Sequence, residues 1–355
     1  MRFTSPQTLL TLTVAATSVA AAPFEYPLPD GFPTPSPAQI AAIEQLAGGT
    51  LPNGPSPANL TKTAITNLHL LALNEFFETA YFTELLANVT NDVPGYDAGS
   101  IAPLDKTYVV DALTAVVNQE QLHALGINAI LAGAGHKIIK PCEYEFPVTT
   151  FKQAILLAQT FTDVVLGTLP KAQAIFAADG GDESPLIQLF GSVLAQEGEQ
   201  AGFYRYVQKK TPSAAPFLTG GSPSFTFTAI QAFIVNGSCP QPLPDIALTT
   251  FGTLNVLTTP EAKNMTLDFS VSGSVSPFNN SIVYLSGQNL PVAVPISNVK
   301  PVAGAFQFQA SFPFESGFAN GLTIAALVKG AGTTFNSTDS VAKATVYGPG
   351  LIEVD

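Results

Sequence analysis

The chain has little positive charge, few histidines and no tryptophan. Its 355 residues include 14 Lys and Arg against 26 Asp and Glu, giving a formal net charge of −12. Because proteins that bind nucleic acid present a basic surface, we expect no nucleic-acid partner. The three histidines, His69, His123 and His136, lack the supporting motifs of a Ser-His-Asp triad. Phosphate-binding loops and dinucleotide-binding glycine motifs are missing as well.

Beyond the first residues, the sequence has no apolar run long enough to span a membrane. At the start, Arg2 precedes the apolar stretch Leu9–Ala16 and the small residues Ser18–Ala22, which predicts a cleaved signal peptide over residues 1–22. Six Asn-x-Ser/Thr sequons follow, at Asn59, Asn88, Asn236, Asn264, Asn279 and Asn336. We therefore expect a glycoprotein that is secreted or held at the cell surface.

Cysteine is scarce, with Cys142 and Cys239 the two in the chain. Neither belongs to a Cys-x-x-Cys pair, which excludes the usual zinc and redox motifs. In the oxidising compartment that the signal implies, two cysteines predict one structural disulfide. Closing so long a loop adds roughly 4 to 5 kcal/mol of stability in the chain-entropy description.

Proline content and apolar periodicity divide the chain into parts. A Pro-rich lead-in covers residues 23–55, with a short helix expected over 37–47. Residues 56–240 then carry the periodicity of a helical bundle. Its four long helices are expected at 57–87, 103–132, 149–178 and 184–210.

Local signals refine these helices. Ser56-Pro57 is expected to begin the first helix, because Ser caps a helix and Pro suits its first position. Gly167 and Pro170 are expected to kink or interrupt the third. A Thr/Pro/Ser/Gly linker follows at 211–224. The apolar run Phe225–Val235 fits either a strand or a fifth short helix.

A second domain is expected over residues 245–355, where Val, Thr, Ser and Phe alternate and turn residues separate short runs. This pattern is typical of a β-sandwich. The fold class is therefore α+β multidomain, a four-helix bundle followed by an all-β sandwich-like domain. The runs expected to form strands are 266–272, 281–285, 306–310, 322–328 and 342–347.

Four acidic residues lie on the apolar stripes of the four expected helices: Glu75, Glu120, Asp163 and Glu197. A carboxylate that faces a bundle core is costly unless something compensates its charge. Glu120 also begins a Glu-x-x-His unit that ends at His123, and this spacing is the ligand pattern of carboxylate-bridged two-metal bundles. The residues predicted to form a metal layer are Glu75, Glu120, His123, Asp163 and Glu197.

The chain resembles the secreted fungal ferritin-like proteins associated with stress response and late sexual development. The resemblance rests on Leu73–Phe82, Asn118–Ala124 and Leu194–Arg205, and more loosely on the terminal Val346–Val354. It implies a ferritin-like bundle whose full metal set has a Glu on helices one and three and Glu-x-x-His on helices two and four. Here Asp163 replaces one Glu and Gln200 replaces one His, while Glu78 offers another carboxylate one turn from Glu75.

Two hypotheses follow. In the first, a degenerate carboxylate site binds iron or manganese, more weakly than a full set because an amide is a poorer ligand than an imidazole. In the second, the protein has no cofactor: the acids share protons, and the bundle is a scaffold without turnover. In that case the β-domain would contact a cell wall or a protein partner. The sequence does not decide whether the protein is an enzyme.

Overall fold

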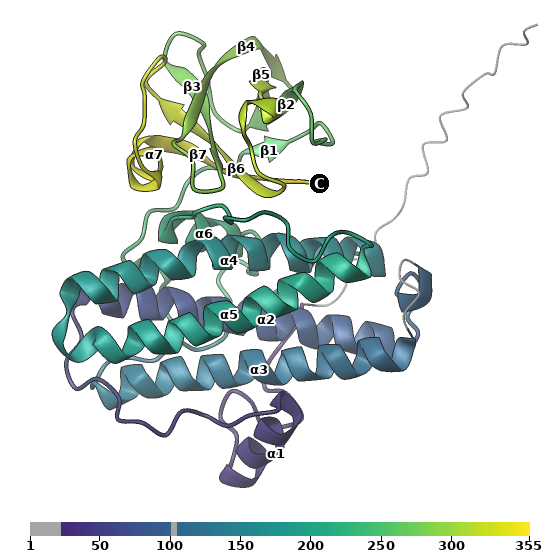
Figure 1. The fold of residues 1–355 in the computed structure, drawn as a ribbon, viewed down its shortest axis with the longest axis vertical. Helices are drawn as coiled ribbons and strands as arrows, with labels where there is room; N and C mark the ends of the chain where they lie inside the picture. Colours follow the sequence, from purple (N-terminus) through teal and green to yellow (C-terminus); the bar gives the residue numbers. More distant parts are fainter. Residues whose placement is uncertain (1–22, 101–104) are drawn as a thin grey trace, which may run out of the picture.

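The computed structural model describes residues 23–100 and 105–355; the expected signal peptide, residues 1–22, lies outside them. A bundle of long helices forms one half of the molecule and an antiparallel β-domain the other (Figure 1). The fold class expected from the sequence is thereby confirmed. None of the helices in the described ranges combines the length and the apolar character that a membrane span requires.

The bundle consists of four helices close to the predicted ranges. They are α2 (Lys62–Thr90), α3 (Lys106–Gly133), α4 (Phe151–Asp179) and α5 (Ser184–Val207). Helix α2 packs against α3 and α4, and α4 packs against α5. Because residues 134–150 form a long connection between α3 and α4, the bundle has the crossover topology of ferritin-like folds.

Side-chain caps explain where the helices begin. The Thr61 hydroxyl accepts a hydrogen bond from the Ala64 amide, so α2 starts at Lys62 and the prediction that Ser56-Pro57 begins it is wrong. The cap at Thr61 prevails because the chain around it is also anchored: the Thr61 amide donates to Glu183, and its hydroxyl donates to Asp179. Asp105 and Thr150 cap α3 and α4 in the same way.

Helix α4 continues through Gly167 and Pro170. The expected interruption of the helix at these residues is therefore absent. Gly167 has a different role: a Cβ at this position would lie 2.2 Å from the Thr219 carbonyl oxygen. The Gly221 amide donates to the Gly167 carbonyl at 2.8 Å. Glycine is therefore required because the backbone of the linker crosses α4 at this point.

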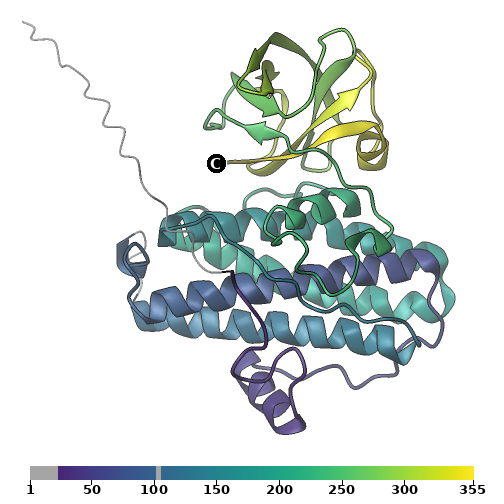
Figure 2. The same cartoon turned by 180° about the vertical axis from the view of Figure 1, so that it is seen from behind.

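Short helices surround the bundle. Helix α1 (Pro37–Ala47), expected from the lead-in, packs on α3 on the side away from the β-domain (Figure 1). The ambiguous run after the linker is a helix, α6 (Pro223–Gln231), which lies between the bundle and the β-domain (Figure 2). The predicted disulfide between Cys142 and Cys239 is present and ties the α3–α4 connection to the segment after α6.

The β-domain is one sheet of seven strands in the order β1-β2-β5-β4-β3-β6-β7, with antiparallel pairs throughout. Strand β4 pairs with β3 through its first half and with β5 through its second, which folds the sheet into a sandwich. A bridge between Gly252 and Tyr347 nearly closes it into a barrel. The strands are β1 (Asn255–Val256), β2 (Met265–Val271), β3 (Asn280–Ser286), β4 (Val292–Val302), β5 (Ala305–Phe312), β6 (Gly321–Lys329) and β7 (Thr345–Val354).

Three details of this domain differ from the prediction. The start of the run 342–347 belongs to a helix, α7 (Thr338–Ala344), because Ser337 and Ser340 form a capping box that the strand pattern did not take into account. The strands β1 and β4 were not expected at all.

Short 3₁₀ turns complete the described chain at Ala98–Ser100, Gly181–Glu183, Leu243–Asp245 and Phe314–Ser316.

The two halves share an apolar layer. Strands β3 and β6 are buried on both faces: one face lines the interior of the sandwich, and the other packs toward the bundle. On the bundle side, Val164 of α4 and Phe225 of α6 complete the layer. The strand side contributes Val283, Leu285, Leu322, Ile324, Ala326 and Val328. Burial of this surface holds the domains together through the hydrophobic effect.

Candidate metal centre

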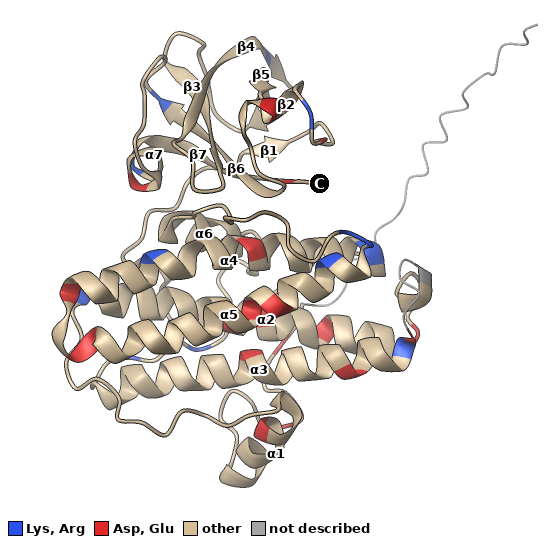
Figure 3. Ribbon diagram, in the orientation of Figure 1, with Lys and Arg blue, Asp and Glu red and all other residues tan. Residues whose placement is uncertain are grey.

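Four of the five predicted ligands meet in the middle of the bundle. Glu75 comes from α2, Glu120 and His123 from α3, and Glu197 from α5; one ligand atom of each lies within 4.8 Å of the others. Figure 3 shows acidic residues of α3, α4 and α5 midway along the bundle, whereas the basic residues of α4 and α5 lie toward the helix ends. The three glutamates are buried, and 15% of the His123 side chain is exposed.

Helix geometry explains this meeting. Glu120 and His123 are one turn apart on α3, so their side chains project from the same face. Apolar neighbours on that face, such as Leu113, Val116 and Val117, pack into the core. The two polar side chains on the same face therefore face the core with them. Glu75 and Glu197 are inserted in the same way among buried residues of α2 and α5.

His123 joins two of the carboxylates. Its Nδ1 atom lies 3.0 Å from Glu120 Oε2 and 3.3 Å from Glu75 Oε2. Burial alone would lower the pKa of His123, but the adjacent Glu75 and Glu120 charges raise it well above its usual range. Burial raises the pKa of Glu75 to about 8, although His123 opposes that rise. The pKa of Glu120 is lowered, because His123 and donated hydrogen bonds outweigh the opposing effect of burial.

Glu197 and Glu78 are buried carboxylates without adequate partners. Within the described residues, both oxygens of Glu197 lack a hydrogen-bond partner, and so does the Oε1 atom of Glu78. Burial, together with the negative charges of Glu120 and Glu75, raises the pKa of both groups well above the usual range. Buried polar atoms are rarely left without a partner, so these oxygens are free to accept a proton or a cation.

Gln200 occupies the position where the resemblance implies a histidine. Its Nε2 atom donates to Glu120 Oε1 at 2.6 Å, and its Oε1 atom accepts from the Tyr204 hydroxyl at 3.2 Å. The amide therefore presents N–H groups to the cluster, and its oxygen is turned toward Tyr204. In this arrangement Gln200 stabilises an ionised Glu120 and offers no ligand atom.

Asp163 is not brought into the cluster. It accepts a hydrogen bond from Gln159 and lies beside Glu353 of β7, at the boundary with the β-domain. Helix α4 is buried on every side from Phe161 to Leu169, because one face packs on the bundle and another on the β-domain. An apolar stripe could therefore not show which face Asp163 occupies. The bundle-facing position near α2 is filled by Phe161, whose ring packs against Phe77, Tyr81 and Phe82.

Comparison with known proteins agrees with this geometry. Residues 63–210 match the family model of the ferritin-like domain. No curated protein matches the chain. The matched span contains α3, α4 and α5 and nearly all of α2, so the whole cluster lies within the ferritin-like domain. The β-domain lies outside it.

Proposed function

We propose that the ferritin-like domain binds a divalent transition-metal ion through Glu75, Glu120, His123 and Glu197. The observation that carries this proposal is the convergence of three carboxylates and one imidazole within 4.8 Å in a buried layer. Oxygen ligands with one imidazole suit iron and manganese, and such an ion would supply Lewis-acid or one-electron chemistry in the bundle.

The state of the donor atoms supports a fit. Both oxygens of Glu197 are buried and accept no hydrogen bond from the described residues. Glu78 is a fifth ionisable group, and its negative charge would repel those of Glu120, Glu197 and Glu75. A cation would stabilise the ionised carboxylates, so binding should release protons and strengthen as the pH rises. Asp163 is left out of the proposed set because it lies at the domain boundary.

The alternative is a scaffold whose acids share protons. It is favoured by His123, which already bridges two carboxylates, and by Gln200, which donates to Glu120. Elemental analysis of the purified protein, reconstituted with Mn²⁺ or Fe²⁺ and then desalted, separates the two functions. A stoichiometric metal content that is lost in Glu75→Gln supports metal binding, and a metal-free parent protein supports the scaffold.

We further propose that the protein is a secreted glycoprotein. Five of the six sequon asparagines are exposed and Asn88 is half-buried on α2, while the disulfide suits an oxidising compartment. An intact mass that lacks residues 1–22 and falls by the mass of glycans after enzymatic removal would support this. A mass equal to the unmodified 355-residue chain would contradict it. A role in stress response or sexual development rests on the resemblance alone.

The β-domain is proposed as the contact for a cell wall or a protein partner. Phe278 and Leu290, on loops of this domain, are 87% and 71% exposed, the highest values among the large apolar side chains of the described residues. Co-sedimentation of the full chain with insoluble cell-wall polysaccharide tests the first kind of partner. Binding that is weakened in Phe278→Ser would support the proposal, and equal binding by parent and variant would contradict it.

A further inference from the structure

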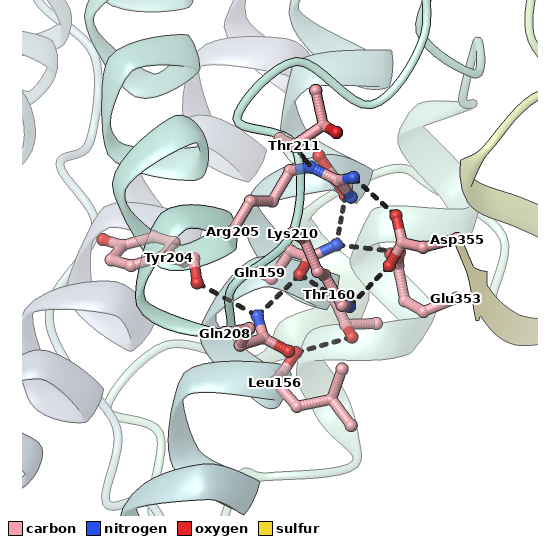
Figure 4. Close-up of polar contacts among 11 residues, drawn as sticks. Leu156, Gln159, Thr160, Tyr204, Arg205, Gln208, Lys210, Thr211, Glu353 and Asp355 are labelled. Atoms are coloured by element: carbon pink, nitrogen blue, oxygen red, sulfur yellow. Dashed lines mark hydrogen bonds and ion pairs between the residues drawn. The ribbon is translucent and has the colours of Figure 1, made fainter. Parts of the chain in front are cut away.

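Where the bundle meets the β-domain, charged and amide side chains form a network (Figure 4). Helix α4 contributes Gln159 and Asp163, and the end of α5 and the residues after it contribute Arg205 and Lys210. The C-terminal strand and the residue after it contribute Glu353 and Asp355. Arg205 and Asp163 are 3% and 6% exposed, Glu353 and Lys210 are half-buried, and Asp355 lies at the exposed edge of the network.

Two carboxyl groups of the network are adjacent across the boundary. The Gln159 Nε2 atom lies 3.1 Å from Glu353 Oε2 and 3.5 Å from Asp163 Oδ2, so a single nitrogen is within reach of both. The other oxygen of Glu353 is buried and has no hydrogen-bond partner in the described chain. Two ionised carboxylates at such short range repel each other strongly in a medium from which water is excluded.

The positive groups nearby form their ion pairs with Asp355, and in the described chain neither forms one with Asp163 or Glu353. Arg205 Nη2 pairs with Asp355 Oδ1, and Lys210 Nζ lies 2.8 Å from Asp355 Oδ2. Lys210 also donates to Gln159 Oε1 at 3.2 Å. Among side chains, the network therefore holds three carboxyl groups against one guanidinium and one ammonium group, and one side-chain carboxyl group lacks a counter-charge.

We propose that Asp163 and Glu353 share one proton across the boundary, and that this proton stabilises the docking of the β-domain on the bundle. A protonated carboxyl group donates to its neighbour, which turns repulsion into a hydrogen bond. The side chains of the network then carry equal numbers of positive and negative charges. The proposal concerns the interface and does not depend on metal binding.

The titration of the two groups agrees with this arrangement. Burial raises the pKa of Asp163 to about 6, against the opposing effects of Gln159, Arg205, a hydrogen bond with Glu353, and Lys210. Burial and the Asp163 charge raise the pKa of Glu353 well above its usual range, and Lys210 partly offsets this. Because both values are raised in the folded state, the stabilisation is complete below about pH 4 and is lost as the pH rises through 6.

Hydrogen exchange of the β7 amides in the full chain, corrected for intrinsic rates, measures docking between pH 4 and 8. Because the pKa of Asp163 is raised from 3.8 to about 6, protection should fall by up to roughly 100-fold across this range. The variants Asp163→Asn and Glu353→Gln resemble the protonated groups. They should match the parent at pH 4 and lose the pH dependence.

A matched control is Asp339→Asn. Asp339 of α7 also pairs across the boundary, with Lys171 of α4, but both side chains are substantially exposed. This variant should keep the pH dependence of the parent. A parent whose β7 protection does not change with pH would overturn the proposal. So would Asp163→Asn and Glu353→Gln variants that lose protection with the same slope as the parent, because the two groups would then have a structural role only.

Discussion

Two groups of acids, one inside the bundle and one at the boundary with the β-domain, are compensated in different ways. In the carboxylate cluster of the bundle, Glu75, Glu78, Glu120 and Glu197 face a single imidazole, and no Lys or Arg of the described chain forms an ion pair with them. At the domain boundary, Asp163, Glu353 and Asp355 face Arg205 and Lys210. The four carboxyl groups of the first group have one cationic side chain beside them, His123. The three carboxyl groups of the second have two, Arg205 and Lys210, and so need one more positive charge.

This difference suggests what each group binds. A deficit of one charge is removed by a single proton, which costs the fold little at acidic pH. A deficit of several charges within one layer calls for several shared protons or for a multivalent cation. Burial of ionised carboxylates without either is too costly to persist. The proposed contrast between a boundary that binds a proton and a core that binds a cation can be tested by substitution.

The largest effect is expected for His123→Ala, which removes the one imidazole of the cluster. Metal affinity should fall by more than the roughly 10- to 100-fold that loss of a supporting hydrogen-bond partner costs. Calorimetric titration with Mn²⁺ measures it. The control is His69→Ala, since His69 lies on α2 but contacts the Lys137 carbonyl, away from the cluster. An equal loss of metal affinity in His123→Ala and His69→Ala would show that the position of His123 in the cluster is not what matters, which would contradict the account.

An intermediate effect is expected for Gly167→Ala at the domain boundary. The added methyl group meets the Thr219 carbonyl and must displace the linker, at a cost of about 1 to 3 kcal/mol. The free energy of unfolding from urea titration measures it, while metal affinity should stay unchanged. Gly198→Ala on α5 is the control: its Cβ meets nothing within 4 Å, so stability should rise by up to about 1 kcal/mol. If Gly167→Ala also abolished metal binding, the two regions would be coupled and could not be treated separately.

The smallest effect is expected for Gln200→His. An imidazole is a better ligand than an amide for such metals, so affinity for Mn²⁺ should rise by about tenfold. Competition against a chelator of known affinity measures this change. Gln196→His, one turn away on α5, is the control, because Gln196 donates to Gln119 and not to a cluster carboxylate. A gain of the same size in both variants would mean that the position of the imidazole is unimportant.

Most of the helical half was predictable from the sequence. Apolar periodicity located α2 to α5 within a few residues, and the short helix α1 and the Cys142–Cys239 disulfide were also expected. Glu120 and His123 were recognisable because a Glu-x-x-His unit on an amphipathic helix has a fixed geometry. These features depend on local rules, so one sequence is enough to reveal them.

Features that depend on packing between distant segments were not predictable. Asp163 was predicted to join the cluster because it lies on an apolar stripe of its helix. That stripe does not identify the bundle-facing side, because α4 is buried on every side from Phe161 to Leu169 once the β-domain is docked. The strand β4 was missed because exposed residues, including a proline, interrupt its apolar pattern. Gly167 was interpreted as a kink because no local signal shows that a linker crosses it.

Calorimetric titration of the chelator-treated parent protein and of Glu197→Gln with Mn²⁺ tests the central claim most directly. The parent should bind at least one ion per chain and release protons, seen as a heat that changes with the ionisation enthalpy of the buffer. Glu197→Gln should bind at least about tenfold more weakly, because it loses the carboxylate whose two oxygens have no other partner in the described chain. A parent that binds no Mn²⁺, or a variant that binds it as tightly as the parent, would contradict the claim that this cluster is a metal centre.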